Sequence, residues 1–193
     1  MLKNSTVTAT IYGIDLQNVS NSTVMENTLV TPSEGVNMVA GDHILFEKNI
    51  LSVHNNGFKL YDSSDNIFVG NTINWNPTGG GFVRYGFSLR NSHRNTASEN
   101  TVHLYQNAGL ISSNDNTFFK NNFLATRGNQ PVIVDSASTG NRFSLPLPDG
   151  GNYWSANTAC IDSDSDGFCD SPYYGLDTLP YAKENGWEAH APR

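Results

Sequence analysis

The sequence predicts an all-β protein built as a right-handed, single-stranded parallel β-helix, or solenoid, of about six rungs, with an irregular C-terminal cap that carries a calcium loop. Three observations predict this architecture. An Asn recurs where short apolar runs end, apolar residues stand at fixed offsets from that Asn, and several strands begin directly after a Gly. Self-similarity at a period of roughly 20 to 50 residues is typical of solenoids and arrays.

The recurring Asn defines the repeat. The residues that close successive apolar runs are Asn27, Asn49, Asn71, Asn100 and Asn121. Subtraction of these positions gives spacings of 22, 22, 29 and 21 residues. In coils stacked at about 4.8 Å, like residues lie above like, so each Asn amide can donate to and accept from the next. Because Asn also tolerates a left-handed backbone at a bend, we expect a ladder of left-handed Asn residues.

Apolar residues repeat in the same register. One row consists of Val24, Phe46, Phe68, Ala97, Phe118 and Phe143, and a second of Leu29, Leu51, Ile73, Val102 and Phe123. A further strand begins after each of Gly13, Gly35, Gly57 and Gly86. These short alternating stretches, separated by turn residues, indicate strands and carry no 3.6-residue period. A leucine-rich repeat has a similar length, but its Leu-rich consensus and helical return are missing.

The repeats occupy residues 1–148, and residues 149–193 are expected to form a cap packed on the same domain. The cap contains the run DSDSDGFCD, which matches the first nine positions of an oxygen-donor calcium loop. The expected ligands are the carboxylates of Asp162, Asp164, Asp166 and Asp170 and the backbone carbonyl of Phe168. Tyr173 replaces the Glu of position 12, so the loop is no EF-hand. A solvated acidic turn is the alternative, but four Asp so close together favour calcium as a structural cofactor.

The two cysteines lie on either side of this acidic loop. Cys160 and Cys169 are nine residues apart, so a bond between them would close the loop. A structural disulfide would imply an oxidising compartment. Two free thiols are the alternative, and the residues alone leave both possibilities open.

The charge balance excludes two classes of partner. A formal net charge of −7 argues against nucleic acid or an anionic membrane surface. The chain contains no apolar run of the roughly 20 residues that a membrane span needs. Its N-terminus reads like the middle of a strand pattern without a signal peptide, so we expect a piece of a longer chain.

The longest repeat spacing contains the run NWNPTGGGFVRYG, which indicates an aromatic corner at the surface. We predict that neighbouring coils turn at the same corner and bring side chains together there as a ligand site. The candidates are His54, Trp75, Phe82, Arg84, Tyr85 and Tyr105. Aromatic faces with polar donors suit a sugar ring. Alternatively, Trp75 and Phe82 only close the loop onto the stack.

Potential catalytic side chains gather at a second corner. The candidates are Asp42, Asp62, Asp65, Arg90 and His93. Carboxylates beside Arg and His could abstract a proton next to a uronate carboxylate, and a carboxyl pair could hydrolyse a glycosidic bond. Asp is also an ordinary turn residue, and stacked turns align such residues without any function.

The stretch from Gly151 to Pro180, GNYWSANTACIDSDSDGFCDSPYYGLDTLP, resembles the segment that ends many NosD-type β-helix proteins. The upstream runs NSTVMENTL, SSDNIFVGNTI and SNDNTFFKNNF resemble the repeats of that family. The resemblance implies an extracellular, cell-surface or periplasmic protein, related to carbohydrate-binding proteins and sugar hydrolases and often part of a larger chain. It also suggests copper, but the chain lacks a Met/His/Cys cluster suited to that metal.

Three functions are consistent with these observations. The first is a calcium-stabilised extracellular module that binds polysaccharide or a cell-surface glycan. The second is a polysaccharide lyase, epimerase or glycoside hydrolase that acts on acidic polysaccharide at the second corner. The third is a structural spacer within a larger surface protein.

Overall fold

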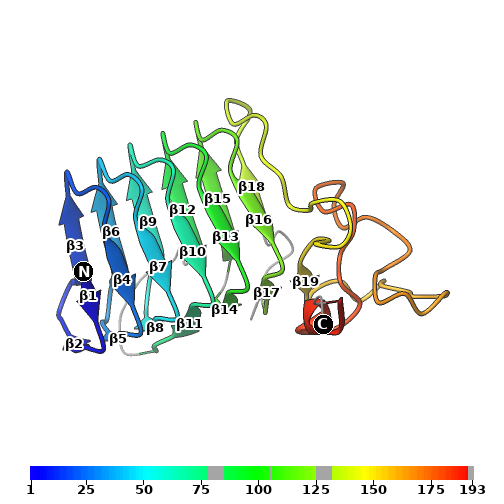
Figure 1. Ribbon diagram of the computed structural model, residues 1–193, viewed down its shortest axis with the longest axis horizontal. Helices are drawn as coiled ribbons and strands as arrows, with labels where there is room; N and C mark the ends of the chain where they lie inside the picture. Colours follow the sequence, from blue (N-terminus) through cyan, green and yellow to red (C-terminus); the bar gives the residue numbers. More distant parts are fainter. Residues whose placement is uncertain (78–84, 105, 125–131, 191–193) are drawn as a thin grey trace.

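The computed structural model describes residues 1–77, 85–104, 106–124 and 132–190. Their strands form three sheets, each built of parallel strands (Figure 1). Sheet A consists of β1 (Leu2–Lys3), β4 (Thr23–Met25), β7 (Leu45–Glu47), β10 (Ile67–Val69), β13 (Thr96–Ser98) and β16 (Thr117–Phe119). Sheet B consists of β2 (Thr6–Thr8), β5 (Thr28–Val30), β8 (Ile50–Val53), β11 (Thr72–Trp75), β14 (Thr101–His103), β17 (Asn122–Phe123) and β19 (Tyr153–Trp154). Sheet C consists of β3 (Tyr12–Gln17), β6 (Glu34–Val39), β9 (Phe58–Tyr61), β12 (Tyr85–Arg90), β15 (Gln106–Ile111) and β18 (Val132–Val134).

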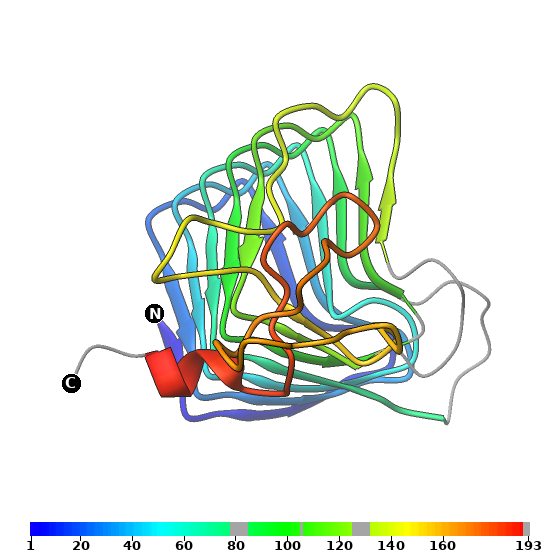
Figure 2. The same cartoon turned by 90° about the vertical axis from the view of Figure 1, so that its right-hand side faces the viewer.

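The chain visits the three sheets in turn and then begins the next coil, so each strand pairs with its equivalent one coil away. Phe68, for example, is opposite Phe46 on one side and opposite Ala97 on the other. Viewed along the stack, the coils superimpose (Figure 2). Two of the sheets contain six strands each among the described residues. The prediction of a parallel β-helix of about six rungs is therefore confirmed.

The Asn ladder runs along the corner between sheets A and B. The side-chain Nδ2 of Asn49 donates to Oδ1 of Asn71 at 2.9 Å, and Asn71 repeats this bond to Asn100. Each Oδ1 also accepts a backbone N–H, as Asn71 does from Asn49 at 2.9 Å. The complete ladder contains Asn27, Asn49, Asn71, Asn100, Asn121 and Asn152. The ladder amides are at most 1% exposed. Burial of an amide without a hydrogen bond costs free energy, and these bonds avoid that cost.

The backbone of the ladder Asn residues is not left-handed, so that expectation was wrong by one position. The residue before each Asn takes the positive φ: Glu26 (54°), Lys48 (52°), Gly70 (64°), Glu99 (58°) and Lys120 (54°). The Asn side chain must point inward to reach its neighbours. The preceding residue, which is Gly in one coil and charged in the other four, therefore makes the change of direction.

Phenyl rings fill the interior in the predicted column. Phe46 stacks on Phe68 with ring centroids 5.0 Å apart, and Phe118 stacks on Phe143 at 5.2 Å. Phe58 and Phe87 of sheet C pack against this column edge-on, at 4.8 and 5.6 Å from Phe68. Such contacts add about 0.5–1.5 kcal/mol per pair beyond the burial of area. The stacked rings thus align sheet A with sheet C.

A column of glycines starts the strands of sheet C because the coils approach closely there. A Cβ on Gly57 would lie 2.8 Å from the carbonyl oxygen of Gly86 and 2.7 Å from Ile73. Asn107 occupies the equivalent position in the next coil, since a Cβ on Gly86 would lie 2.8 Å from its carbonyl oxygen. The side chain of Asn107 is fully buried and has no hydrogen-bond partner among the described residues.

The C-terminal segment closes one end of the stack. Trp154 of β19 packs on Phe123 with ring centroids 4.6 Å apart, and Tyr173 packs on Trp154 at 4.9 Å. The remainder is irregular apart from the 3-10 helix η1 (Gly186–His190), whose His190 packs on Phe168 at 5.0 Å. Sheet B and the Asn ladder thus continue into the segment that was predicted as the cap.

Candidate functional sites

The polar corner, defined as Asp42, Asp62, Asp65, Arg90 and His93, lies where the chain passes from sheet C to sheet A. Arg90 ends β12, and the other four lie in the connections that follow β6, β9 and β12. Asp62 and Asp65 have positive φ values of 48° and 60°. Asp is among the few residues that adopt this conformation readily, so backbone geometry alone accounts for both positions.

Three ionisable groups at this corner, those of Asp42, Asp65 and His93, have local partners. Arg94 makes two hydrogen bonds to the Asp65 carboxylate, at 2.8 and 2.7 Å, and these bonds hold the pKa of Asp65 below its ordinary value. Asp42 contacts His43 at 2.9 Å. Nδ1 of His93 accepts the backbone N–H of Asn114 at 3.0 Å. Asp65 is thus held as an ionised carboxylate in an ion pair, which suits a structural turn better than a general acid.

The aromatic corner, at the passage from sheet B to sheet C, contains three of its predicted residues in described positions. Trp75 ends β11 with 43% of its surface exposed, and Tyr85 begins β12 half-buried. His54 is only 2% exposed, and its Nδ1 donates to the carbonyl of Asn76 at 2.9 Å, so it lies beneath the surface. Phe82, Arg84 and Tyr105 lie outside the described residues.

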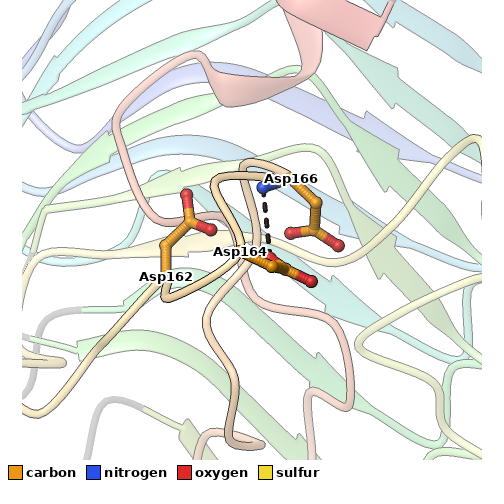
Figure 3. Close-up of side chains that lie close together, drawn as sticks. All are labelled: Asp162, Asp164 and Asp166. Carbon is orange, nitrogen blue, oxygen red and sulfur yellow. Dashed lines mark hydrogen bonds between the residues drawn. The ribbon is translucent and has the colours of Figure 1, made fainter.

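The acidic loop brings three carboxylates together (Figure 3). The ligand oxygens of Asp162, Asp164 and Asp166 all lie within 4.8 Å of one another. Within the loop, Oδ1 of Asp164 accepts the N–H of Asp166 at 3.2 Å, and Oδ2 of Asp162 accepts that of Gly167 at 3.1 Å. Oδ1 of Asp162 is buried and has no partner among the described residues. Such an oxygen is available to a cation.

The other two predicted ligands are placed differently. Asp170 accepts the N–H of Ser163 at 3.2 Å and is not part of the three-carboxylate group. The ring of Phe168 packs on Tyr181 with centroids 4.7 Å apart. Calcium coordination by the Asp170 carboxylate and the Phe168 carbonyl stays a prediction.

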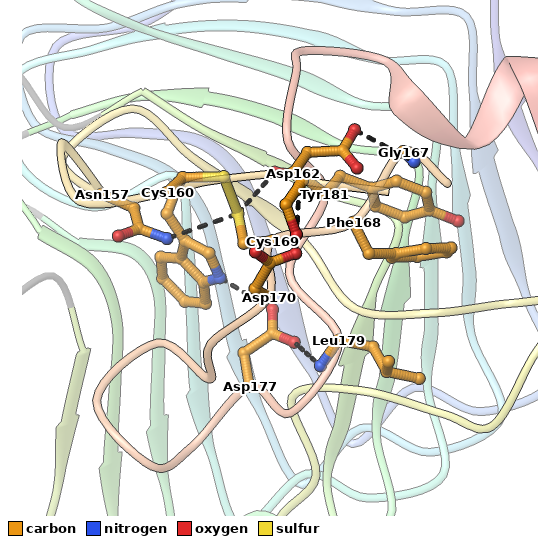
Figure 4. The surroundings of a disulfide bond; sticks show 12 residues. Asn157, Cys160, Asp162, Gly167, Phe168, Cys169, Asp170, Asp177, Leu179 and Tyr181 are labelled. Carbon is orange, nitrogen blue, oxygen red and sulfur yellow. Dashed lines mark hydrogen bonds between the residues drawn. A yellow bond between two sulfur atoms is a disulfide. The ribbon is translucent and has the colours of Figure 1, made fainter. Parts of the chain in front are cut away.

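A disulfide closes the acidic loop, which answers the question that the sequence left open. Cys160 and Cys169 are bonded, with their Cα atoms 5.1 Å apart (Figure 4). The backbone N–H of Cys169 donates to the carbonyl of Pro180 at 2.8 Å. This hydrogen bond joins the loop to the rest of the cap. The disulfide agrees with an oxidising compartment.

Sequence reasoning missed the role of Asp177, which anchors the cap to the end of the ladder. Its Oδ2 accepts the backbone N–H of Asn152 at 2.7 Å and the indole N–H of Trp154 at 2.7 Å. Its Oδ1 accepts the backbone N–H of Leu179 at 3.1 Å. Burial raises the pKa of this carboxyl to about 6, against the opposing effect of these donors. A Cβ on Gly151 would overlap the carboxylate, so the Gly next to the ladder is what admits it.

Sequence reasoning also missed the outer face of sheet C. Lys59, Tyr61 and Arg90 are on this face, with the Lys59 Nζ 5.5 Å and the Arg90 Cζ 5.6 Å from the Tyr61 ring centroid. The period-2 pattern of the strands could have identified these outward positions, had they been aligned coil by coil.

Comparison with known proteins finds a family whose model matches this chain. A family model described as "Periplasmic copper-binding protein (NosD)" matches residues 1–159. Neither the curated proteins nor the solved structures contain a match. Among the described residues, no helix has the length and apolar character to cross a membrane.

Proposed function

The chain belongs to the NosD family, and from this premise we propose that it is a β-helix module that binds polysaccharide and is stabilised by calcium at its C-terminal end. The family is periplasmic, and the chain has a disulfide, so its location is extracellular or periplasmic.

The observation that carries the polysaccharide proposal is the pair of aromatic residues at the aromatic corner. Within the longest repeat spacing, Trp75 ends β11 and Tyr85 begins the next strand, β12. The exposed Trp75 ring offers an apolar face for the C–H groups of a sugar. A lyase or hydrolase is less favoured, because Asp65 at the polar corner is engaged by Arg94.

Retention of the protein on a panel of immobilised neutral and acidic polysaccharides tests this proposal. We expect retention on at least one polymer and a loss of at least tenfold in affinity for Trp75→Ala. Tyr174→Ala is the matched control, since Tyr174 is an exposed aromatic residue of the cap (62%) away from this corner. Absence of retention on every polymer would support the structural-spacer alternative instead.

The calcium proposal rests on the donor set of the acidic loop. Asp162, Asp164 and Asp166 present clustered carboxylate oxygens, and one buried oxygen of Asp162 has no partner among the described residues. Hard oxygen ligands suit calcium, which would neutralise the mutual repulsion of these groups and hold the loop in place.

The same residues do not fit copper. Copper favours imidazole and sulfur ligands. Both cysteines are bonded to each other, and within the described part of the chain the candidate metal group contains carboxylates and no His. We therefore do not extend the copper in the family's description to this chain.

Calorimetric titration and thermal unfolding test the metal assignment. Calcium is expected to raise the melting temperature of the native protein and to leave that of Asp164→Ala unchanged. Glu184→Ala serves as the control, because Glu184 is an exposed acidic residue of the cap outside the loop. An unchanged melting temperature after chelation, together with no calcium in elemental analysis, would remove the proposal.

A further inference from the structure

The outer face of sheet C carries a cluster of polar and aromatic side chains from adjacent strands. The cluster consists of Lys59, Tyr61, Tyr85, Ser88 and Arg90, with Gly109 opposite Ser88 in the next strand. Because strands in a sheet are about 4.8 Å apart, outward side chains of equivalent positions lie next to one another. Lys59 is opposite Ser88, and Tyr61 is opposite Arg90. Three consecutive coils therefore contribute side chains or backbone to this face. Tyr85 lies both on this face and at the aromatic corner.

Tyr85 lies against the backbone of the neighbouring strand. A Cβ on Gly109 would be 2.8 Å from Cε1, 3.0 Å from Cζ and 3.1 Å from Cδ1 of the Tyr85 ring. Real Cβ atoms do not approach a ring this closely, so the glycine is what lets the ring lie over β15. The Tyr85 ring therefore lies over β15 at Gly109.

The positive charges of the face differ in what they contact. Lys59 pairs with Glu34 at 3.4 Å, and the second oxygen of Glu34 accepts two hydrogen bonds from Asn56, at 2.9 and 2.8 Å. Arg90 is exposed and makes no ion pair with any described residue, including Asp62 at the adjoining corner. Its guanidinium lies over the Tyr61 ring.

The carboxylate of Asp15, in β3 of the same sheet, also accepts hydrogen bonds. Oδ1 of Asp15 accepts hydrogen bonds from Asn37 and Gln17, both at 2.8 Å. Glu34 is neutralised by Lys59. Among the described residues of β9, β12 and β15, Arg90 is the charged residue that has no ion pair, despite a formal net charge of −7 for the whole chain.

We infer that the outer face of β9, β12 and β15 selects polysaccharides whose sugars carry a carboxylate, with Arg90 as the carboxylate-binding residue and Tyr85 as the stacking platform. This inference rests on the proposed polysaccharide binding and names its substrate class. A guanidinium binds a carboxylate through two parallel hydrogen bonds. The guanidinium of Arg90 lies over the Tyr61 ring, with its Cζ 5.6 Å from the ring centroid. Gly109 is a positioning residue, since it acts through Tyr85.

A pair of ligands that differ only in charge tests the inference. Titration calorimetry compares a short oligogalacturonate with its methyl ester, which keeps the ring stereochemistry and removes the carboxylate charge. We expect the acid to bind at least tenfold more tightly, and this preference to shrink as salt concentration rises. Arg90→Gln should remove the preference and leave the ester unaffected. Arg142→Gln is the matched control, because Arg142 is an exposed Arg near β16 of sheet A.

Gly109→Ala supplies a second readout. The added methyl group must displace the Tyr85 ring, so binding of both the acid and the ester should fall at least fivefold. Equal affinity for the two ligands, or an unchanged preference in Arg90→Gln, overturns the inference and leaves polysaccharide binding intact. Failure to retain any neutral or acidic polymer of the panel overturns both.

Discussion

Asn71 shows how a single buried amide holds three coils in register. Its Oδ1 accepts both the backbone and the side-chain N–H of Asn49, and its Nδ2 donates to Asn100 and to the carbonyl of Phe46. An amide that is fully buried and bonded at both ends stabilises the fold, because each of its partners would otherwise be buried without a hydrogen bond.

Replacing this amide should therefore be costly. We expect Asn71→Ala to lower the free energy of unfolding by about 3 kcal/mol, since it leaves several buried groups without partners. Asn55→Ala, at a half-buried site whose side-chain bond to Ser33 is 3.4 Å long, should change it by less than about 0.5 kcal/mol. Denaturant unfolding measures both values. Equal effects of the two variants would contradict the role of the ladder.

Asn107 presents the opposite case, a buried amide without a partner among the described residues. Leu has nearly the same shape and carries no polar atoms. Asn107→Leu is therefore expected to raise the free energy of unfolding by about 1 kcal/mol or more, the cost of an unsatisfied buried group. Loss of stability in this variant would indicate that the amide has a role that the described contacts do not reveal.

Asp177 makes stability depend on pH. Its pKa in the folded protein is raised to about 6, above the ordinary value of 3.8, so the folded state binds the proton more tightly than the unfolded state. This group therefore stabilises the protein fully below about pH 3.8, and the contribution is lost as the pH rises through about 6.

The matching experiment compares the native protein with Asp177→Asn. Between pH 7 and pH 4, Asp177 should add about 2 kcal/mol to the free energy of unfolding. Asp65 acts in the opposite direction, because its pKa is lowered, and it contributes equally to both proteins. The difference between the two pH profiles isolates Asp177. Parallel profiles would show that its carboxyl does not titrate in this range.

At the scale of elements, the disulfide and the acidic loop form one unit. Cys160 and Cys169 enclose the three clustered carboxylates, so the bond restricts the same segment that a cation would order. The double variant Cys160→Ser, Cys169→Ser should lose about 2–3 kcal/mol of stability, as expected for closing a loop of this length.

Calcium affinity should fall in the same variant, since part of the binding free energy must then order the loop. Titration calorimetry at fixed pH measures this fall. The native protein treated with reductant is the control, and it should match the double variant. Unchanged affinity in both would show that the loop keeps its conformation without the bond.

At the scale of the whole molecule, the two ends of the stack differ. The first coil leaves Leu2, Val7 and Leu16 only partly buried, whereas Trp154 at the other end is 3% exposed beneath the cap. In a solenoid each coil contacts only its neighbours, so an uncovered end opens more easily than the middle.

Hydrogen exchange resolved along the chain should therefore show a gradient. Amides of β1, β2 and β3 are expected to exchange fastest among the strands, and those of β9 and β12 slowest. Asp177→Asn should accelerate exchange at β19 and leave β9 unchanged, because Asp177 bonds only the capped end. Uniform protection from end to end would instead mean that the stack opens in a single cooperative step.

The amino-acid sequence by itself determined the coil register, the phenyl column and the Asn ladder. These features repeat, so stacking converts a fixed spacing in sequence into a contact in space, and the spacing alone places Phe46, Phe68 and Phe118 in one column. The three clustered Asp residues of the acidic loop were likewise predictable, because they are close in sequence.

Only the tertiary structure decided which residues meet outside the repeat. Asp177 reaches Asn152 through a segment without periodicity, and the burial of His54 depends on side-chain directions at one corner. The position of the Tyr85 ring over Gly109 depends on packing between neighbouring coils. Such contacts depend on packing between segments that do not repeat, so no spacing along the sequence predicts them.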